Sequence, residues 1–404
     1  MAHERISSPL WVQTEYRSRF GLLGSMAQEL LQAANDRGIE AAAAGGTDDT
    51  TLAGRGTFVF FNAPPTVRDL PPGLLAPAGQ LRAVQFFVDH PLALHAPVLD
   101  ALQHGGRIDR LALVMPCRDD AEIATSRWPG LSVAHAPHGV ARHALCDEST
   151  ITEHELAARP ADCVVAGWIH SRDEIRQLAS ILPGSMHNPA FEVAARLVES
   201  PTTPFSTAAE DILPGVLSAD RQLLVAFWRV VTAITGRERR SSMVEALQGR
   251  TLRVYGPPAW QEFCEGTIEY HGEAPYARIA RVFGEGRTVL AWAPTQFATG
   301  HSERVLLAMA SGAVTLAEDK PSFRSEIDPE GQAALTFDGA DPATIRASLE
   351  VALTDHEEAI ERARAARRLV ESRHLWAHRL DAILEAASGE RRGGDARGRS
   401  AHAA

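Results

Sequence analysis

The sequence contains little lysine and little cysteine. Lys320 is its only lysine, so 39 of the 40 basic residues are arginines, and an arginine at any single position says little about mechanism. The four cysteines, Cys117, Cys146, Cys163 and Cys264, are scattered without CxxC spacing. This spacing indicates neither a disulfide framework nor a structural zinc site. We expect no metal site.

Long hydrophobic runs are also absent. No apolar stretch approaches the roughly 20 residues that a membrane-spanning helix needs. The opening residues carry charge where a secretory signal has an apolar core. We therefore expect a cytoplasmic protein without a transmembrane segment. The 51 acidic against 40 basic residues give a net charge of -11, which disfavours nucleic acid as a partner, so an anionic ligand needs a local site.

Two common nucleotide-binding fingerprints are missing as well. The chain has neither a G-x-G-x-x-G turn after its first predicted strand nor a G-x-x-x-x-G-K-[ST] loop. Their absence disfavours the oxidoreductase and kinase classes. The 404 residues are roughly two to three times the length of a usual domain, and the apolar content of 45% suffices for two cores. We expect two domains.

Short β-like runs alternate with helical stretches from the start of the chain, which is typical of parallel α/β sheets. A helix is predicted over residues 21–35, where Leu22, Met26 and Leu30 recur at helical spacing. Strands with apolar cores and polar or proline-containing ends are predicted at 10–12, 57–61, 82–88, 111–115 and 131–135. Together they form one Rossmann-like domain, residues 1–155.

A second α/β series begins near residue 162. Ser171 and Glu174 have the spacing of a capping box, which predicts the start of a helix after the first strand of this series. With its first strand included, this series is predicted to contain five strands, at 162–167, 251–255, 267–270, 288–291 and 313–316. We predict a second Rossmann-like domain, residues 156–387.

The end of the chain is predicted to be helical. Thr354 and Glu357 have the spacing of another capping box. Residues 388–404 are rich in arginine and glycine without apolar periodicity, and we expect a disordered tail there. The linker around 148–159 and the returning terminal helix are expected to act as hinge and strap between the domains.

A glycine turn that feeds a helix is the most informative unit of the second half. Helix N-termini present free N–H groups and a positive dipole end, which can hold a diphosphate. Gly300 permits close backbone approach, His301 and Ser302 can donate to phosphate oxygens, and Glu303 can accept from ribose hydroxyls. Ordinary helix capping by a polar turn explains the same residues.

A second strand-to-helix crossing carries Gly167 and Arg172. Open sheets bind ligands at such crossings, and an arginine can neutralise phosphate with its fork of donors. A surface arginine in a capped first turn is the alternative interpretation.

Asp89 and His90 emerge together at the end of a predicted strand of the first half. Either one can act as the base that removes a proton from an acceptor hydroxyl. His135 and His138, near a later strand end, are rivals for that role. The alternative is that Asp89 caps the turn and His90 fills the space between the domains.

With these units placed, residues 162–384 resemble the C-terminal domain of the CgeB-like, spore-maturation type of glycosyltransferase. Five short motifs carry the resemblance in the same order: Cys163–Gly167 followed by Arg172, Leu252–Trp260, Ile268–Gly272 leading to Tyr276, Gly300–Ala313 and His374–Arg379.

The resemblance implies GT-B architecture, an α/β fold in which two Rossmann-like domains with parallel sheets face a cleft. It implies a nucleotide-sugar donor held mainly by the second domain, an acceptor approached from the first domain, no cofactor, and sugar transfer without a metal ion. By their positions in the motifs, the donor-binding residues are Gly167, His170, Arg172, Tyr255, Gly256, His271, Gly272, Gly300, His301, Ser302, Glu303 and Arg304.

One departure from the related enzymes leaves the mechanism open. Many retaining GT-B enzymes have a glutamate directly before the Ala-Met-Ala segment, where this chain has Leu307. Both retention and inversion therefore stay open. The acceptor is a glycan, a protein or a small metabolite. The alternatives to a glycosyltransferase are a nucleotide-sugar epimerase or hydrolase on the same scaffold, and a noncatalytic partner protein that binds nucleotide sugars.

Overall fold

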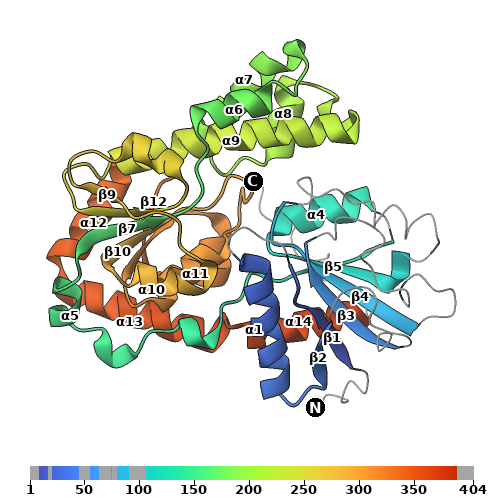
Figure 1. Cartoon of the computed structure of the whole chain (residues 1–404), viewed down its shortest axis with the longest axis horizontal. Coiled ribbons are helices and arrows are strands. Elements are labelled where there is room, and N and C mark those ends of the chain that lie inside the picture. Colours follow the sequence, from blue (N-terminus) through green and yellow to red (C-terminus); the bar gives the residue numbers. More distant parts are fainter. Residues whose placement is uncertain are drawn as a thin grey trace, which may run out of the picture.

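The structure is a computed structural model of the whole chain. It describes residues 9–16, 21–44, 55–62, 74, 80–90, 106, 108–128 and 130–388. The tail predicted at 388–404 lies, apart from its first residue, outside the described residues. Figure 1 shows two sheets in separate lobes, with a group of helices projecting from one of them.

The first sheet has six parallel strands in the order β2-β1-β3-β4-β5-β6. The strands are β1 (Leu10–Gln13), β2 (Ala41–Ala44), β3 (Arg55–Phe61), β4 (Gln80–Phe86), β5 (Leu111–Met115) and β6 (Ser132–His135). Helices α1 (Leu22–Asp36) and α14 (Trp376–Ser388) pack together and against this sheet, and α4 (Arg118–Arg127) contacts β5 and β6. The five strands and the helix predicted for this half are confirmed; β2 was not predicted.

The second sheet also has six parallel strands, in the order β12-β11-β10-β7-β8-β9. The strands are β7 (Ala161–Ala166), β8 (Leu252–Tyr255), β9 (Ile268–Tyr270), β10 (Gly286–Ala291), β11 (Val314–Glu318) and β12 (Ala334–Phe337). Its flanking helices are α5 (Glu153–Ala157), α10 (Ile279–Phe283), α11 (Glu303–Ala310), α12 (Ala343–Thr354) and α13 (His356–Arg373). All five strands predicted for the second half are confirmed, and β12 is an additional one.

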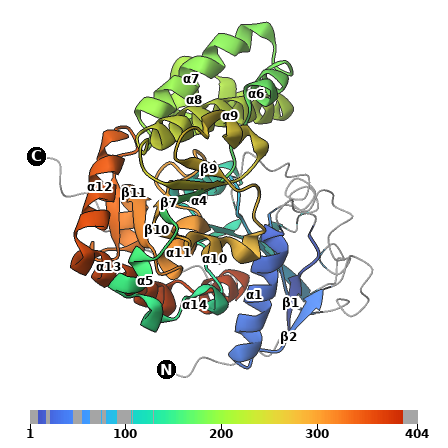
Figure 2. The same cartoon turned by 60° about the vertical axis from the view of Figure 1, so that its left-hand side comes forward.

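A helical unit is inserted between β7 and β8. It consists of α6 (Arg172–Ala179), α7 (His187–Glu199), α8 (Phe205–Ile212) and the 25-residue helix α9 (Arg221–Glu245). Val193, Phe227 and Val231 belong to a hydrophobic cluster of its own. Figures 1 and 2 show this unit projecting beyond both sheets.

Two predicted capping boxes have different outcomes. Ser171 and Glu174 form the predicted box at the start of α6. The second box is wrong, because Thr354 is the last residue of α12, and Asp355 caps α13 by accepting from the backbone N–H of Glu358 at 3.0 Å. The aspartate is the residue that lies in the non-helical break between the two helices, so its side chain reaches the free N–H groups.

The chain passes between the lobes at two places that lie side by side. The backbone N–H of Val140 donates to the carbonyl of His374 at 3.0 Å, and that of Trp376 donates to the carbonyl of Val140 at 3.1 Å. A side chain at Gly139 would meet Trp376 at 3.0 Å, so a glycine is needed at this crossing. The terminal helix α14, which the predicted boundaries place in the second domain, therefore packs on the first sheet. The hinge itself stays a prediction.

Several arginines of α13 hold the linker between the lobes. Arg367 donates to the carbonyl of Cys146, and Arg364 to that of Ile151, each at 2.8 Å.

Of the helices in the described ranges, none combines the length and apolarity that crossing a bilayer requires. All four cysteines are free thiols.

Candidate functional site

A pocket with about 590 Å³ of empty space, partly open to solvent, lies where the second sheet faces the first lobe. Five of the predicted donor-binding residues line it: Gly167, Tyr255, Gly256, Glu303 and Arg304. The ends of β7 and β8 and the first turn of α11 supply them. The other lining residues are Leu22, Ala166, Trp168, Ala274, Tyr276, Ile279 and Leu307, of which Leu22 alone comes from the first lobe.

Two glycines allow the strand ends at this pocket to approach each other. A Cβ atom at Gly256 would collide with the carbonyl oxygen of Gly167 and lie 2.6 Å from the ring of Trp260. A Cβ atom at Gly167 would lie 2.8 Å from the ring of Trp292 and 3.3 Å from Nη1 of Arg304. Larger residues would therefore displace the side chains that form the pocket wall.

Positive charge gathers behind the pocket wall. Arg304 lies in the first turn of α11, and its Nη1 has no hydrogen-bond partner. The guanidinium of Arg240, on α9, lies 5.5 Å from the ring centre of Trp292. Burial, and then the charges of Arg304 and Arg239, lower the pKa of Arg240 to about 9. Within the described ranges no carboxylate forms an ion pair with Arg240.

A buried ionic network lies next to these arginines. Glu318 pairs with Arg239 in a short hydrogen bond, accepts from the backbone N–H of Ala293 at 2.9 Å, and lies 3.7 Å from Nζ of Lys320. Lys320 donates to the carbonyls of Pro201, Phe297 and Ala298 at 2.7–2.9 Å. Burial lowers its pKa to about 8. This network fixes the loop between β10 and α11 that leads to the pocket.

The residues of the predicted turn 300–304 lie in different surroundings. A Cβ atom at Gly300 would lie 3.0 Å from Sγ of Cys117, so this glycine faces the first lobe. His301 is buried edge-on against Phe323, and burial lowers its pKa to about 3. The hydroxyl of Ser302 accepts from the backbone N–H of Arg304 at 3.4 Å and caps α11.

Only the last two residues of that turn line the pocket. Glu303 is 5% exposed. No described donor forms a hydrogen bond with its carboxylate. Glu303 and Arg304 are therefore the polar side chains that this turn presents to a ligand in the pocket.

Four further predicted donor-binding residues do not line the pocket. The carbonyl of His170 accepts from Arg237 at 2.9 Å, and Arg172 is the exposed first residue of α6. The ring of His271 stacks on Tyr255 with 5.2 Å between the centroids. Gly272 accepts from the backbone N–H of Gly256 at 2.9 Å.

The two candidate bases of the first lobe have different surroundings. Asp89 is half-buried and accepts from Nδ2 of Asn62 at 2.9 Å and from Nε2 of Gln296 at 3.3 Å. His90 is only 4% exposed; it stacks on Trp228 and lies 3.3 Å from Asp120. Burial lowers the pKa of His90 to about 3.

The rival histidines also lie between the lobes. His135 Nε2 lies 3.5 Å from Glu326 of the second lobe. His138 is buried between the rings of Phe86 and Phe297, and burial lowers its pKa, although the charges of Glu303 and Asp89 act in the opposite direction. His138 thus lies within electrostatic range of one carboxylate from each lobe.

Polar contacts connect the start of α4 to two segments of the second lobe, the loop before α11 and the turn that follows β11. The hydroxyl of Thr299 donates to Asp119 at 2.6 Å, and Arg118 pairs with Glu326 at 2.5 Å. Together with the bond from Gln296 to Asp89, these contacts hold Asp89 against the second lobe.

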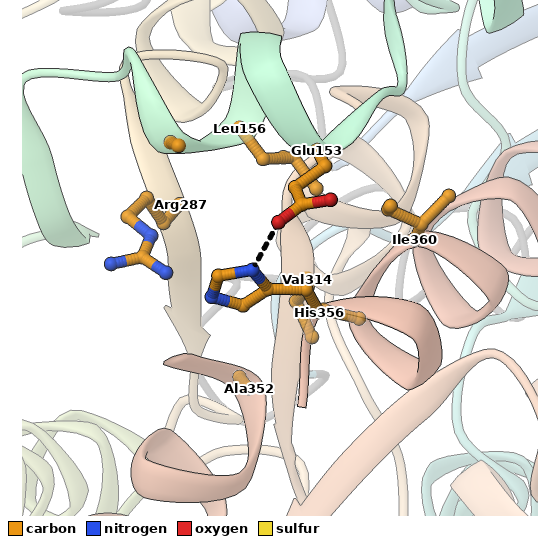
Figure 3. A pocket seen from close by; sticks show the side chains of 9 residues that line it. Glu153, Leu156, Arg287, Val314, Ala352, His356 and Ile360 are labelled. Atoms are coloured by element: carbon orange, nitrogen blue, oxygen red, sulfur yellow. Dashed lines mark hydrogen bonds and ion pairs between the residues drawn. The ribbon is translucent and has the colours of Figure 1, made fainter. Parts of the chain in front are cut away.

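A smaller pocket, with about 290 Å³ of empty space, lies between α5, α12 and α13. Figure 3 shows His356 and Glu153 facing each other across it, with Nδ1 of His356 2.7 Å from Oε1 of Glu153. Arg287 lines the same pocket. No residue predicted to bind the donor or the acceptor lies there. The pair ties the linker helix to α13.

No described His, Cys, Asp and Glu side chains gather in a group of three or more that could hold a metal ion. Metal-independent transfer stays a prediction, because this observation does not test it.

The residues that sequence reasoning missed are Asn62, Arg240 and Tyr276. Asn62 and Arg240 belong to no sequence motif. Their roles in the site arise from contacts with segments far away in the chain.

Comparisons with known proteins support the fold. Residues 237–385 match a family model described as "Glycosyl transferase-like". This segment contains four of the pocket residues predicted from sequence: Tyr255, Gly256, Glu303 and Arg304. No curated protein matches the chain in sequence.

Solved structures are similar to this chain at low sequence identity. The DNA-modifying enzyme β-glucosyltransferase, studied with and without its substrate uridine diphosphoglucose, has a TM-score of 0.52 and 11% identity over 94% of this chain and 99% of that one. Sucrose-phosphate synthase from Thermosynechococcus elongatus has a TM-score of 0.46 and 10% identity over 82% of this chain and 72% of that one. The expected α/β fold with GT-B architecture is confirmed. The glycosyl transferase-like match is limited to residues 237–385.

Proposed function

We propose that this protein is a glycosyltransferase that moves a sugar from a nucleotide-sugar donor to an acceptor. The observation that carries the proposal is the pocket at the ends of β7 and β8, which places Glu303, Arg304 and the backbone of Gly167 around one space. In open α/β sheets, ligands bind at such carboxyl ends of strands. The match of residues 237–385 to a glycosyl transferase-like family includes eight of the twelve residues that line this pocket.

The donor's diphosphate lies beside Arg304 in this proposal. Arg239, Arg240 and Lys320 are buried near one another, and Glu318 is the carboxylate that pairs with the first and last of them. The group therefore carries more positive than negative charge in a site of low dielectric, where an anionic ligand is strongly favoured. Arg304 extends this charge to the pocket surface.

The apolar part of the pocket holds the nucleoside. Leu22, Tyr255, Tyr276 and Ile279 provide the surface for the base. Glu303, buried without a hydrogen-bond donor, accepts from the ribose hydroxyls. The β-glucosyltransferase of similar fold uses uridine diphosphoglucose, so UDP-glucose is the first donor to test.

Asp89 is the base in the proposed reaction. Its carboxylate takes the proton of an acceptor hydroxyl as the hydroxyl oxygen attacks the anomeric carbon, and the bond from that carbon to the nucleoside diphosphate breaks. Arg304 stabilises the negative charge of the departing diphosphate without a metal ion. His90 is not assigned this role because it is buried and its pKa of about 3 leaves it a weak base. A single displacement of this kind inverts the anomeric centre.

Calorimetry with UDP-glucose tests the donor site. The variant Arg304→Gln removes one charge-assisted contact, and we expect its affinity to fall about 10- to 100-fold. Arg172→Gln is the matched control, because Arg172 is exposed on α6 and does not line the pocket. Loss of affinity in the control, with full affinity in Arg304→Gln, would place the donor elsewhere.

Arg240→Met separates a ligand-binding role from a structural one. The substitution keeps an unbranched apolar side chain and removes a buried charge that no described carboxylate pairs with. We expect a thermal stability of the free protein at least equal to that of the wild type, together with weaker UDP-glucose binding. Lower stability with unchanged binding would contradict the proposed phosphate role.

Product analysis identifies the reaction. With UDP-glucose and a panel of glycans, proteins and small metabolites, a glycosyltransferase forms a glycosylated acceptor and releases UDP. An epimerase forms a new sugar nucleotide without an acceptor, and a hydrolase releases free sugar. Equal transfer rates with and without EDTA are expected for metal-independent transfer.

We also propose that the protein is a glycosyltransferase of the CgeB-like type and that it lies in the cytoplasm. The five motifs in their order support the first, and the four free thiols support the second, because thiols stay reduced in the cytoplasm.

A further inference from the structure

Asn62 has an unusual backbone conformation at the end of β3. Its φ of 56° makes it the only non-glycine residue with positive φ among the residues that the structure describes. This left-handed conformation costs free energy in a residue with a side chain, although asparagine tolerates it better than most. Such strained residues cluster at functional sites. Asn62 is also 7% exposed, so its surroundings hold it in place.

The side-chain amide of Asn62 makes three hydrogen bonds to the end of the neighbouring strand. Its Oδ1 accepts from the backbone N–H groups of Val88 at 2.8 Å and Asp89 at 3.1 Å. Its Nδ2 donates to Oδ2 of Asp89 at 2.9 Å. Only a side chain with both an acceptor and a donor can hold the backbone and the carboxylate at once.

The two oxygens of Asp89 therefore have different partners. Oδ2 is bound to Asn62 of the same lobe. Oδ1 accepts from Nε2 of Gln296, across the space between the lobes, at 3.3 Å. This second bond is long for an N–H···O contact, so an acceptor hydroxyl can replace Gln296 at little cost.

We infer that Asn62 is the positioning residue of this site: it binds Oδ2 of Asp89 so that Oδ1 faces the acceptor hydroxyl. The inference rests on the proposed function, since it assigns Asp89 the proton. The left-handed turn at Asn62 is then the backbone geometry that brings its amide over the end of β4.

Other ionisable groups near Asp89 come from three elements. His90 follows it in the chain but is paired with Asp120 of α4. His138, after β6, interacts electrostatically with Asp89 and with Glu303 of α11. Substitutions at Asn62 leave all of these groups unchanged, so a change in the pH profile can be assigned to the contact with Asp89.

The variant Asn62→Asp tests the inference through the pH dependence of the reaction. Aspartate tolerates the left-handed backbone and keeps an acceptor for the two N–H groups, but it replaces the donor by a second carboxylate. Two carboxylates at hydrogen-bond distance oppose each other's ionisation. We expect the acidic limb of kcat/KM for UDP-glucose consumption to move up by about one pH unit. An unshifted limb would overturn the inference, because a merely structural residue does not move it.

Asn62→Gly is the second variant, and it keeps the backbone conformation while removing all three hydrogen bonds. We expect kcat to fall at least tenfold with an unchanged dissociation constant for UDP-glucose. An unchanged kcat would also overturn the inference. If the wild type neither binds nor consumes UDP-glucose, the proposed function fails instead. In that case carbon-13 NMR titration of the aspartate carboxyls, with Asp89→Asn for assignment, still tests the contact: an Asp89 titration that is the same in the wild type and Asn62→Asp contradicts it.

Discussion

Acid is expected to unfold this protein because three buried histidines stay unprotonated in the folded state. Burial lowers the pKa of each of His90, His301 and His374 from 6.5 to about 3. In the unfolded chain the same rings take up protons near pH 6.5. Below that pH the unfolded chain binds more protons than the folded one, so the free energy of unfolding falls as the pH falls from 6.5 toward 3.

The size of the effect follows from these pKa values. Between pH 7 and pH 5, each of the three rings lowers the free energy of unfolding by about 2 kcal/mol, or about 6 kcal/mol in total. Glu29 acts in the opposite direction, since burial raises its pKa to about 7. Its protonation in the folded state offsets about 2 kcal/mol. For these four groups together the loss is about 4 kcal/mol, a large part of the 5–15 kcal/mol that typical domains have.

Urea titration monitored by tryptophan fluorescence at pH 7 and pH 5 measures this loss. In His301→Gln the difference between the two pH values should shrink by about 2 kcal/mol. The control His154→Gln changes an exposed histidine, and its difference should equal that of the wild type. Equal stability of the wild type at both pH values, or an unchanged difference in His301→Gln, would refute the reasoning.

Two substitutions test other parts of the structure. In Lys320→Met, three backbone carbonyls lose their donor and Glu318 loses a neighbouring charge; we expect a loss of about 3–5 kcal/mol in urea titration, and a loss below about 1 kcal/mol would contradict the role of the network. In Gly167→Ala, the added Cβ would lie 2.8 Å from Trp292; we expect UDP-glucose affinity to fall at least tenfold, while Gly184→Ala, where a Cβ meets nothing within 4 Å, binds normally. Full affinity in Gly167→Ala would show that the ligand does not depend on this wall.

The positions of most strands along the chain could be predicted because apolar runs and turn residues are local signals. The run Cys163–Ala166 is buried on both faces of a parallel sheet, so its apolar residues are continuous and easy to recognise. The strand Ala41–Ala44 was missed because four alanines give no β-branched or aromatic signal. It forms because β1 provides a parallel partner for all four residues. Pairing with β1, and not the intrinsic strand propensity of alanine, therefore determines that this segment is a strand.

The site could be predicted only in part for a similar reason. The turn before α11 identified Glu303 and Arg304, since a glycine followed by a capped helix is visible in sequence. The direction in which each side chain points depends on distant neighbours. Gly300 meets Cys117 of the other lobe. Arg240 lies within a long helix without a motif, and only the packing of that helix against Trp292 reveals its unpaired charge.

The central claim is that an activated sugar binds between the lobes with its diphosphate at the second sheet. A crystal structure of the protein soaked with UDP tests this claim most directly. The account predicts phosphate oxygens within hydrogen-bond distance of Arg304 and the backbone at Gly167, and ribose hydroxyls at Glu303. UDP bound at another surface, with the pocket at β7 and β8 still empty, would contradict it.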